Sequence, residues 1–307
     1  MKTNYGVISD IHRAHPKNVE QAFQELKRRA VQAIVLNGDI VGDQFYILDP
    51  LDYFTHVLTY AADADLETYI LPGSHEEVAQ LEPVVKAFQG KYKNLVYTVE
   101  EPKIEKPDHH LVFLPGSDWR AGLAVESGFM LERTSNPSGL YRNGNKGLIR
   151  VINMNDLKKL VTDPEKTVLF SHVPRKFYNV ETGFDMALFG EATLDFPLQG
   201  HFVEKGSVFP GPVAYKLKEQ GLPVRIKNED RGNRDLEEIM KELGIKKQVT
   251  GHFHESAQRA HDLKCNPVEQ GNFTDELFWM ASYLDGLKVG ILTVDGNKVS
   301  YENIDLN

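Results

Sequence analysis

The sequence predicts an α/β protein built on a largely parallel sheet that is covered by helices. Two observations predict this class. Short apolar runs typical of buried strands alternate, in the N-terminal part of the chain, with segments whose apolar residues recur at helical spacing. The C-terminal end adds apolar stretches joined by a turn sequence, which is typical of an antiparallel hairpin.

Strand and helix candidates follow one another closely up to the third helix. Asn18 is suited to cap the first helix, and Pro72-Gly73 ends the third strand. The expected strands are Tyr5–Ser9, Ala33–Leu36 and Thr68–Leu71, and the expected helices are Asn18–Ala30, Leu51–Ala62 and Glu76–Gln89.

The rest of the chain is more irregular. Residues 115–150 and 183–230 lack a clear period and contain several Gly residues, so we expect loops there, the second stretch being an insertion into a single domain over 1–307. A helix is expected between Asn233 and Gly244. Further strands are expected at Leu95–Thr98, His110–Leu114, Val168–Ser171, Gln248–Thr250, Leu277–Ala281, Val289–Val294 and Lys298–Asn303, the last two forming the C-terminal antiparallel hairpin.

Bulk composition excludes several classes of protein. The chain has 307 residues, 41% hydrophobic and 26% charged, with a net charge of −9, so extended nucleic-acid binding is not expected. Cys265 is the single cysteine, which excludes an intramolecular disulfide and a cysteine-rich zinc site. No apolar leader and no run of ~18 apolar residues is present, so we expect a cytoplasmic protein without a membrane partner, its oligomeric state being open.

Polar clusters follow five of the expected strands. The carboxyl ends of parallel strands line one crevice, so these clusters are expected to converge. Two carboxylates and several imidazoles would destabilise one another there unless a cation were present, which favours a binuclear metal centre. The clusters are Asp10-Ile11-His12, Asn37-Gly38-Asp39, Gly73-Ser74-His75-Glu76, Ser171-His172 and Gly251-His252-Phe253-His254.

Local geometry supports the same interpretation. Side chains two apart in extended backbone point to one side, so both residues of an Asp-x-His or His-x-His pair can reach one cluster. The glycines before Asp39, Ser74 and His252 allow a close approach of the backbone. Any one match is weak, since an isolated Asp-x-His or Asn-Gly-Asp is most often an ordinary turn. Five matches together are strong evidence.

In this order, the five clusters resemble the signature of the calcineurin-like metallophosphoesterase superfamily, and they span nearly the whole chain. The resemblance implies a four-layer α/β/β/α sandwich with the metal site at the C-terminal ends of the strands. It implies two divalent ions, of Mn, Fe, Ni or Zn. By position, one ion would be held by Asp10, His12 and His254, and the other by His172 and His252, with Asp39 bridging them.

The resemblance also implies the chemistry. A hydroxide bridging the two ions would attack phosphorus, with Asp39 and His75 as catalytic residues and His75 as acid or transition-state donor. Two departures from the family pattern matter. Ser74 stands where the family has an asparagine ligand, which makes it a weaker metal ligand, and Asp43 is only an approximate match to the aspartate that orients the catalytic histidine.

Substrate contacts are less specific. Arg13 and Arg175 follow two of the clusters and are candidates to bind a substrate phosphate, a surface arginine being the alternative for each. The function expected is a metal-dependent phosphoester hydrolase, a phosphodiesterase rather than a phosphomonoesterase, acting on a nucleotide or small phosphodiester. The alternative is a non-catalytic binding or scaffold protein with a degraded metal site, for which Ser74 is the only support.

Overall fold

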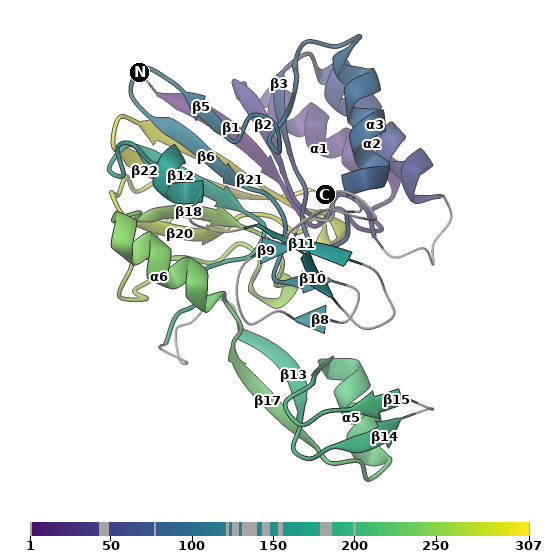
Figure 1. Ribbon diagram of the computed structural model, residues 1–307. Coiled ribbons are helices and arrows are strands. Elements are labelled where there is room, and N and C mark those ends of the chain that lie inside the picture. The colour runs from purple at the N-terminus through teal and green to yellow at the C-terminus, as the bar shows by residue number, and fades with distance from the viewer. Residues whose placement is uncertain are drawn as a thin grey trace.

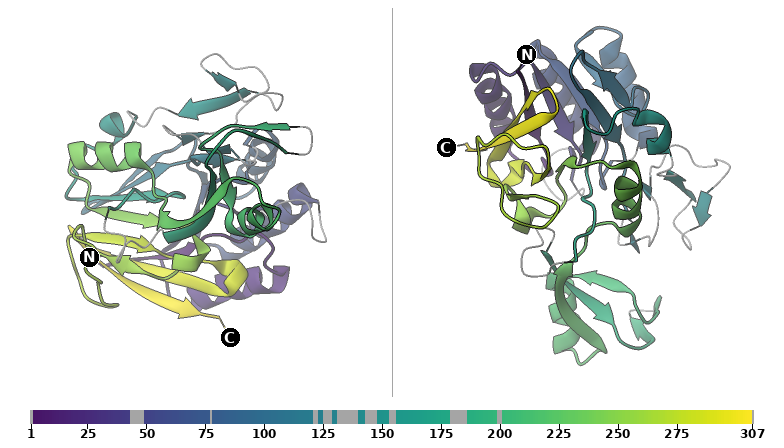
Figure 2. Two further views of the ribbon diagram at one scale, coloured as in Figure 1. Left: turned by 90° about the horizontal axis from the view of Figure 1, so that it is seen from below. Right: turned by 90° about the vertical axis from the view of Figure 1, so that its left-hand side faces the viewer.

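The computed structural model describes residues 2–42, 49–76, 78–120, 123–124, 129–130, 140–142, 148–152, 156–178, 186–198 and 201–306. Its body consists of two six-stranded sheets packed face to face with helices on both outer sides (Figure 1). A smaller lobe projects from the body, as Figure 1 and the right-hand view of Figure 2 show.

The first sheet is parallel at its centre. Strand β1 pairs in parallel with β2, β2 with β3 and β3 with β4, whereas β21 runs antiparallel to both β1 and β22. The order is β22-β21-β1-β2-β3-β4. Its strands are β1 (Thr3–Ile8), β2 (Ala33–Asn37), β3 (Glu67–Leu71), β4 (Leu95–Tyr97), β21 (Lys288–Asp295) and β22 (Lys298–Asp305).

The second sheet also has a parallel centre, and both of its edge strands are antiparallel to their neighbours. Its order is β19-β20-β18-β12-β6-β5. The strands are β5 (Lys103–Glu105), β6 (His110–Leu114), β12 (Thr167–Ser171), β18 (Lys247–Thr250), β19 (Ala260–His261) and β20 (Leu277–Met280).

Three apolar layers hold the body together. Helices α1 (Pro16–Arg28), α2 (Pro50–Ala64) and α3 (Val78–Gln89) bury one face against the first sheet. Residues such as Tyr5 and Phe170 fill the space between the sheets. Helices α4 (Leu157–Leu160) and α6 (Arg234–Leu243) pack on the second sheet. The architecture is therefore the expected four-layer α/β/β/α sandwich.

Two helices begin two residues away from the predicted position, each for a local reason. Helix α1 begins at Pro16 rather than near Asn18, because His15 accepts a hydrogen bond from the Lys17 amide and a proline suits the first helical turn. Helix α3 begins at Val78 rather than Glu76, because the Glu76 carboxylate turns back to bind backbone amides of earlier loops.

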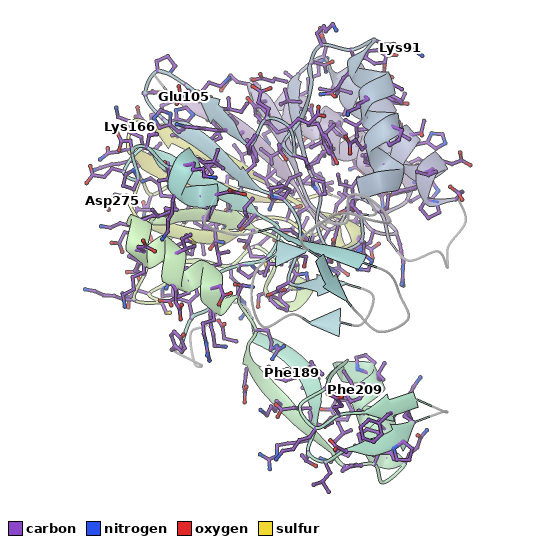
Figure 3. All side chains as sticks on the ribbon, in the orientation of Figure 1. Lys91, Glu105, Lys166, Phe189, Phe209 and Asp275 are labelled. Atoms are coloured by element: carbon purple, nitrogen blue, oxygen red, sulfur yellow. The ribbon has the colours of Figure 1, made fainter. Side chains whose placement is uncertain are left out.

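The lobe consists of residues 186–198 and 201–230, within the segment 183–230 where loops were expected. It contains regular elements around a small core of its own that includes Phe196, Leu217 and Val224, and Phe189 and Phe209 lie in it (Figure 3). Its core is small and buries only one or two residues of each contributing element, so no clear apolar period marks these elements in the sequence. Its elements are β13 (Met186–Ala192), β14 (Phe196–Leu198), β15 (His201–Val203), β16 (Val208–Pro210), α5 (Gly211–Glu219) and β17 (Val224–Asp230).

Short elements complete the described chain. The region expected as loops before residue 150 contains paired strands of two to five residues. They are β7 (Trp119–Arg120), β8 (Leu123–Ala124), β9 (Phe129–Met130), β10 (Leu140–Arg142) and β11 (Leu148–Ile152). Two single-turn helices, η2 (His254–Ser256) and η3 (Leu284–Gly286), lie beside the site described below. Among the described helices, none has the length and apolarity needed to cross a bilayer.

Candidate metal centre

The polar clusters named above all follow strands that run in parallel within their sheets. Each cluster begins within two residues of a strand's last residue, and contacts between ligands from the two sheets show that all the clusters meet at one edge of the sandwich. Asp10 and His12 follow β1, Asp39 follows β2, Ser74 and His75 follow β3, His172 follows β12, and His252 and His254 follow β18.

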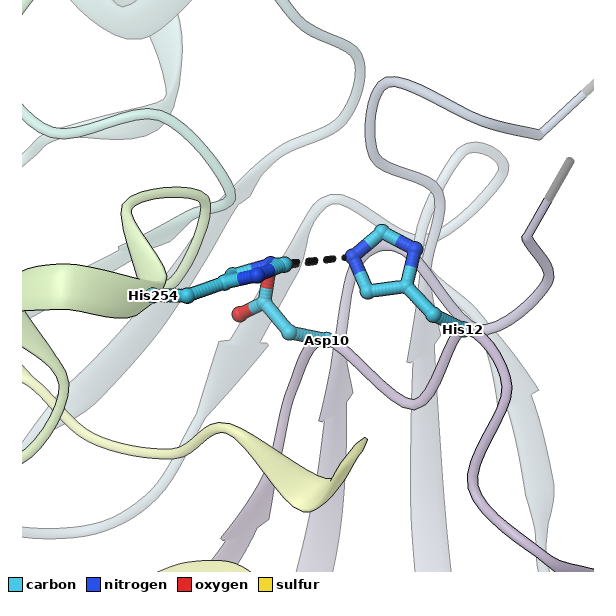
Figure 4. A group of neighbouring side chains, drawn as sticks. All are labelled: Asp10, His12 and His254. Atoms are coloured by element: carbon cyan, nitrogen blue, oxygen red, sulfur yellow. Dashed lines mark hydrogen bonds and ion pairs between the residues drawn. The ribbon is translucent and has the colours of Figure 1, made fainter. Parts of the chain in front are cut away.

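One group of potential ligands joins the loops after β1 and β18. The His254 Nε2 atom lies 3.1 Å from Asp10 Oδ1 and 3.0 Å from His12 Nε2 (Figure 4). The His12 Nε2 atom lies 3.7 Å from the same Asp10 oxygen. Two nitrogens and a carboxylate oxygen therefore point at one small volume, which is the donor set that Zn²⁺ or Mn²⁺ accepts.

A second group consists of Asp39, His172 and His252. The His172 Nε2 atom lies 2.9 Å from Asp39 Oδ2, while the ring's Nδ1 atom donates to the Asn37 carbonyl at 3.0 Å. That second hydrogen bond fixes the ring so that Nε2 faces the carboxylate, as is typical of a metal-binding histidine. The rings of His172 and His252 lie edge to face, with centroids 5.1 Å apart.

Asp39 connects the two groups. Its Oδ2 atom lies 3.6 Å from His12 Nε2 and 3.8 Å from His75 Nε2, in addition to its contact with His172. The carboxylate is thus within reach of donors from both groups, which is the position that a bridging ligand needs.

The backbone at these ligands adopts an unusual conformation. Asp10, His12, Asp39 and His252 all have positive φ angles, of 51°, 40°, 50° and 80°. Non-glycine residues rarely occupy this region, and they cluster at functional sites. Gly73 is required beside them, since a side-chain carbon there would lie 2.5 Å from Asp39 Oδ1.

Hydrogen bonds orient the Asp39 carboxylate. The Ser74 and His75 amides donate to its Oδ1 atom at 2.6 and 3.0 Å. The Ser74 hydroxyl oxygen lies 2.9 and 2.8 Å from the Oδ1 and Oδ2 atoms and donates to the carboxylate. Ser74 therefore contacts the central carboxylate directly.

Glu76 organises the loops that carry these groups. Its buried carboxylate accepts hydrogen bonds from the backbone amides of Asp39, Val41 and Gly73. This joins the loop after β2 to the loop after β3. The sequence placed Glu76 within a cluster, and its adjacency to His75 was the only signal of a role, because the partners of its carboxylate depend on the fold.

The electrostatics of the site fit a cation. Burial alone would lower the pKa of His172, but the charges of Asp39 and Asp10 raise it to about 10. The two buried carboxylates thus attract positive charge to the place where Nε2 points, and a metal ion can replace that proton. Burial and His172 lower the pKa of His252 to about 3, which leaves its nitrogen free to donate to a metal.

The carboxylates themselves stay ionised. Burial would raise the pKa of Asp10, yet the hydrogen bonds with His12 and His254 lower it well below its usual range. Burial opposes the same effect at Asp39, whose pKa is lowered by the neighbouring His172 and His75. The residues present therefore fit divalent metal, with anionic oxygens and neutral nitrogens as donors.

The two arginine candidates lie in different surroundings. Arg13 is exposed on the loop directly after His12. Arg175 is buried, and its guanidinium contacts Glu237 at 3.1 Å and lies over the Phe177 ring. These contacts are with residues outside the metal-ligand groups, so they give Arg175 a structural role. Asp43 lies outside the described residues.

Comparisons with known proteins bear on the family and the fold of the chain. A family model described as calcineurin-like phosphoesterase matches residues 3–256. No curated protein sequence matches the chain. The crystal structure of TT1561 of Thermus thermophilus is similar, with a TM-score of 0.56 and 9% identity over 99% of each chain. That of a dimetal phosphatase from Danio rerio has a TM-score of 0.47 and 12% identity, again over 99% of each chain.

Proposed function

Because the chain belongs to the calcineurin-like phosphoesterase family and is a metal-dependent phosphoester hydrolase, we propose that it holds two divalent ions and prefers phosphodiesters. The observation that carries the two-ion proposal is the position of Asp39. Its Oδ2 atom lies 2.9 Å from His172 Nε2 and 3.6 Å from His12 Nε2, so one carboxylate serves both ligand groups.

The proposed ligands divide as the groups do. Asp10, His12 and His254 hold one ion, and His172 and His252 hold the other, with Asp39 shared. When bound, the ions supply a hydroxide nucleophile near neutral pH and neutralise charge on the phosphoryl oxygens. We propose that Ser74 supports the second ion indirectly. Its hydroxyl donates a hydrogen bond that orients the shared Asp39 carboxylate.

His75 has a separate role in this proposal. It is partly exposed at the edge of the centre, with Nε2 3.8 Å from Asp39 Oδ2. From there its Nε2 atom donates a proton to the oxygen of the leaving group as the bond between phosphorus and that oxygen breaks. Arg13, exposed beside His12, is the proposed contact to a non-bridging phosphoryl oxygen.

The preference for a diester rests on charge. A phosphodiester carries one negative charge, whereas a phosphomonoester carries up to two near neutral pH. The described residues gathered at the centre are His, Asp and Ser, and the guanidinium of Arg175 is paired with Glu237. A substrate with less charge to neutralise, such as a nucleotide diester or a small phosphodiester, suits this set better.

A parallel assay tests the proposal. Mono- and bis-(p-nitrophenyl) phosphate are offered with Mn²⁺, Ni²⁺ or Zn²⁺, and bound metal is measured by elemental analysis. We expect about two ions per chain and faster turnover of the diester. Asp39→Asn is the control and should lose both bound metal and turnover. Hydrolysis of the monoester alone contradicts the diester preference, and one ion per chain in active protein contradicts the two-ion centre.

A further inference from the structure

A tyrosine outside the five clusters contacts one of the proposed ligands. The ring of Tyr283 stacks on the ring of His254, with centroids 4.2 Å apart and planes 15° from parallel. Tyr283 follows β20, about 30 residues beyond the Gly251–His254 cluster. Its place in the site depends on the fold, which brings the connection after β20 against the loop after β18.

His254 is more exposed than two of the other proposed histidine ligands, so its ring has more need of support. Its side chain is 34% exposed, against 11% for His12 and 0% for His172. A metal-binding histidine must keep its ring plane and donor nitrogen fixed, and a hydrogen bond from the Nδ1 atom of His172 does this for that ring. For His254, the flat face of Tyr283 limits rotation of the ring and keeps Nε2 directed at Asp10.

The platform that carries Tyr283 is itself joined to Asp10. Helix η3 begins directly after Tyr283, and its Leu284 and Asp285 amides donate to the Ser9 and Asp10 carbonyls at 3.0 and 3.2 Å. The Tyr283 amide also donates to the Lys288 carbonyl at 3.1 Å. One short segment therefore holds the backbone of one ligand and the ring of another.

The space behind the ring is limited as well. A side-chain carbon added at Gly286 would lie 2.6 Å from the Tyr283 ring. Glycine at this position lets the ring lie between residue 286 and His254. An alanine there would push the ring out of its place, which offers a second way to disturb the stack without altering Tyr283.

We propose that Tyr283 is a positioning residue that holds the His254 imidazole in the orientation needed to bind the ion shared with Asp10 and His12. The inference rests on the proposed two-metal function. It concerns the aromatic ring of Tyr283 that stacks on His254, which phenylalanine keeps and an aliphatic residue does not.

The test compares Tyr283→Leu with the matched control Tyr283→Phe. Metal-free protein is titrated calorimetrically with Mn²⁺, and the visible absorption spectrum of the Co²⁺-loaded protein is recorded. We expect Tyr283→Leu to lower the affinity for one of the two ions by ~10-fold or more and to alter the Co²⁺ spectrum. The affinities of Tyr283→Phe should stay within about twofold of those of the wild type. The binding event that is weakened in Tyr283→Leu should be the one that is lost in the titration of His254→Ala.

Gly286→Ala provides a second variant if Tyr283→Leu fails to fold. It should lower the affinity for the same ion. Wild-type affinity in both Tyr283→Leu and Gly286→Ala overturns the inference, as does an equal loss in Tyr283→Phe. Absence of metal binding by the wild-type protein instead overturns the proposed function, so the two failures are distinguishable.

Discussion

The Ser74 hydroxyl oxygen lies 2.8 Å from the nearer carboxylate oxygen of Asp39, to which it donates a hydrogen bond. Ser74 occupies the position at which the family pattern has an asparagine ligand. A serine hydroxyl engaged with the carboxylate leaves the second ion with Asp39, His172 and His252 as its protein ligands. The second ion is therefore expected to be the more weakly bound of the two.

Replacing Ser74 with the asparagine of the family pattern should raise the affinity for the second ion. In Ser74→Asn, the side-chain amide oxygen reaches farther than the serine hydroxyl and can ligate directly, so we expect about 10-fold higher affinity for the second Mn²⁺ ion in calorimetric titration. Ser74→Ala is the control, and it should lower the affinity for the second ion only slightly. A loss of about 10-fold or more in Ser74→Ala would instead identify the serine as a direct ligand.

His75 is expected to affect turnover and not metal content. Its Nε2 atom is 3.8 Å from Asp39 Oδ2, and its place in the proposal is that of a proton donor. His75→Ala should lower kcat by ~10²–10⁴-fold and leave bound metal at the wild-type level. Elemental analysis beside steady-state kinetics measures both quantities. Loss of metal together with activity would show that His75 is a ligand.

Glu76 should contribute strongly to stability. Glu76→Ala leaves the buried amides of Asp39, Val41 and Gly73 without their acceptor, so the free energy of unfolding should fall by about 3 kcal/mol. Urea denaturation in the presence of EDTA measures this in metal-free protein. The control is Glu100→Ala, which removes one partner of an exposed ion pair with Lys86 and should cost less than about 0.5 kcal/mol. Equal losses in the two variants would refute the assigned role.

His261 should make stability depend on pH. Burial, reinforced by the charge of Arg175 and opposed by the contact with Asp262, lowers its pKa from 6.5 to about 4. Between these values the unfolded chain binds a proton that the folded chain does not, so stability is complete above pH 6.5 and is lost as the pH falls toward 4.

The size of that loss is measurable. It should amount to about 3 kcal/mol, and His261→Gln should remove it from the pH profile of the free energy of unfolding. Measuring both proteins in EDTA keeps metal release out of the comparison. The two proteins share all their other histidines, so the difference between their profiles reports on His261. Parallel profiles for the two proteins would show that His261 does not carry the effect.

Much of the fold was predictable because its signals are local. A buried strand is a short apolar run wherever it lies, and the alternation of strands and helices favours a parallel sheet. The convergence of the polar clusters was also predictable, because parallel strands end at one edge of their sheet. These clusters follow β1, β2, β3, β12 and β18. The lobe was missed as a structured unit because its core buries only one or two residues of each contributing element, which is too few to leave a period in the sequence.

The sequence by itself determined which residues stand at the strand ends, and hence that Asp10, Asp39 and His172 meet. Only the tertiary structure decided what surrounds them. Glu76 binds the loop after β2, and Tyr283 stacks on His254. The physical reason is that such contacts join residues far apart in the chain, through side-chain directions that no local pattern encodes.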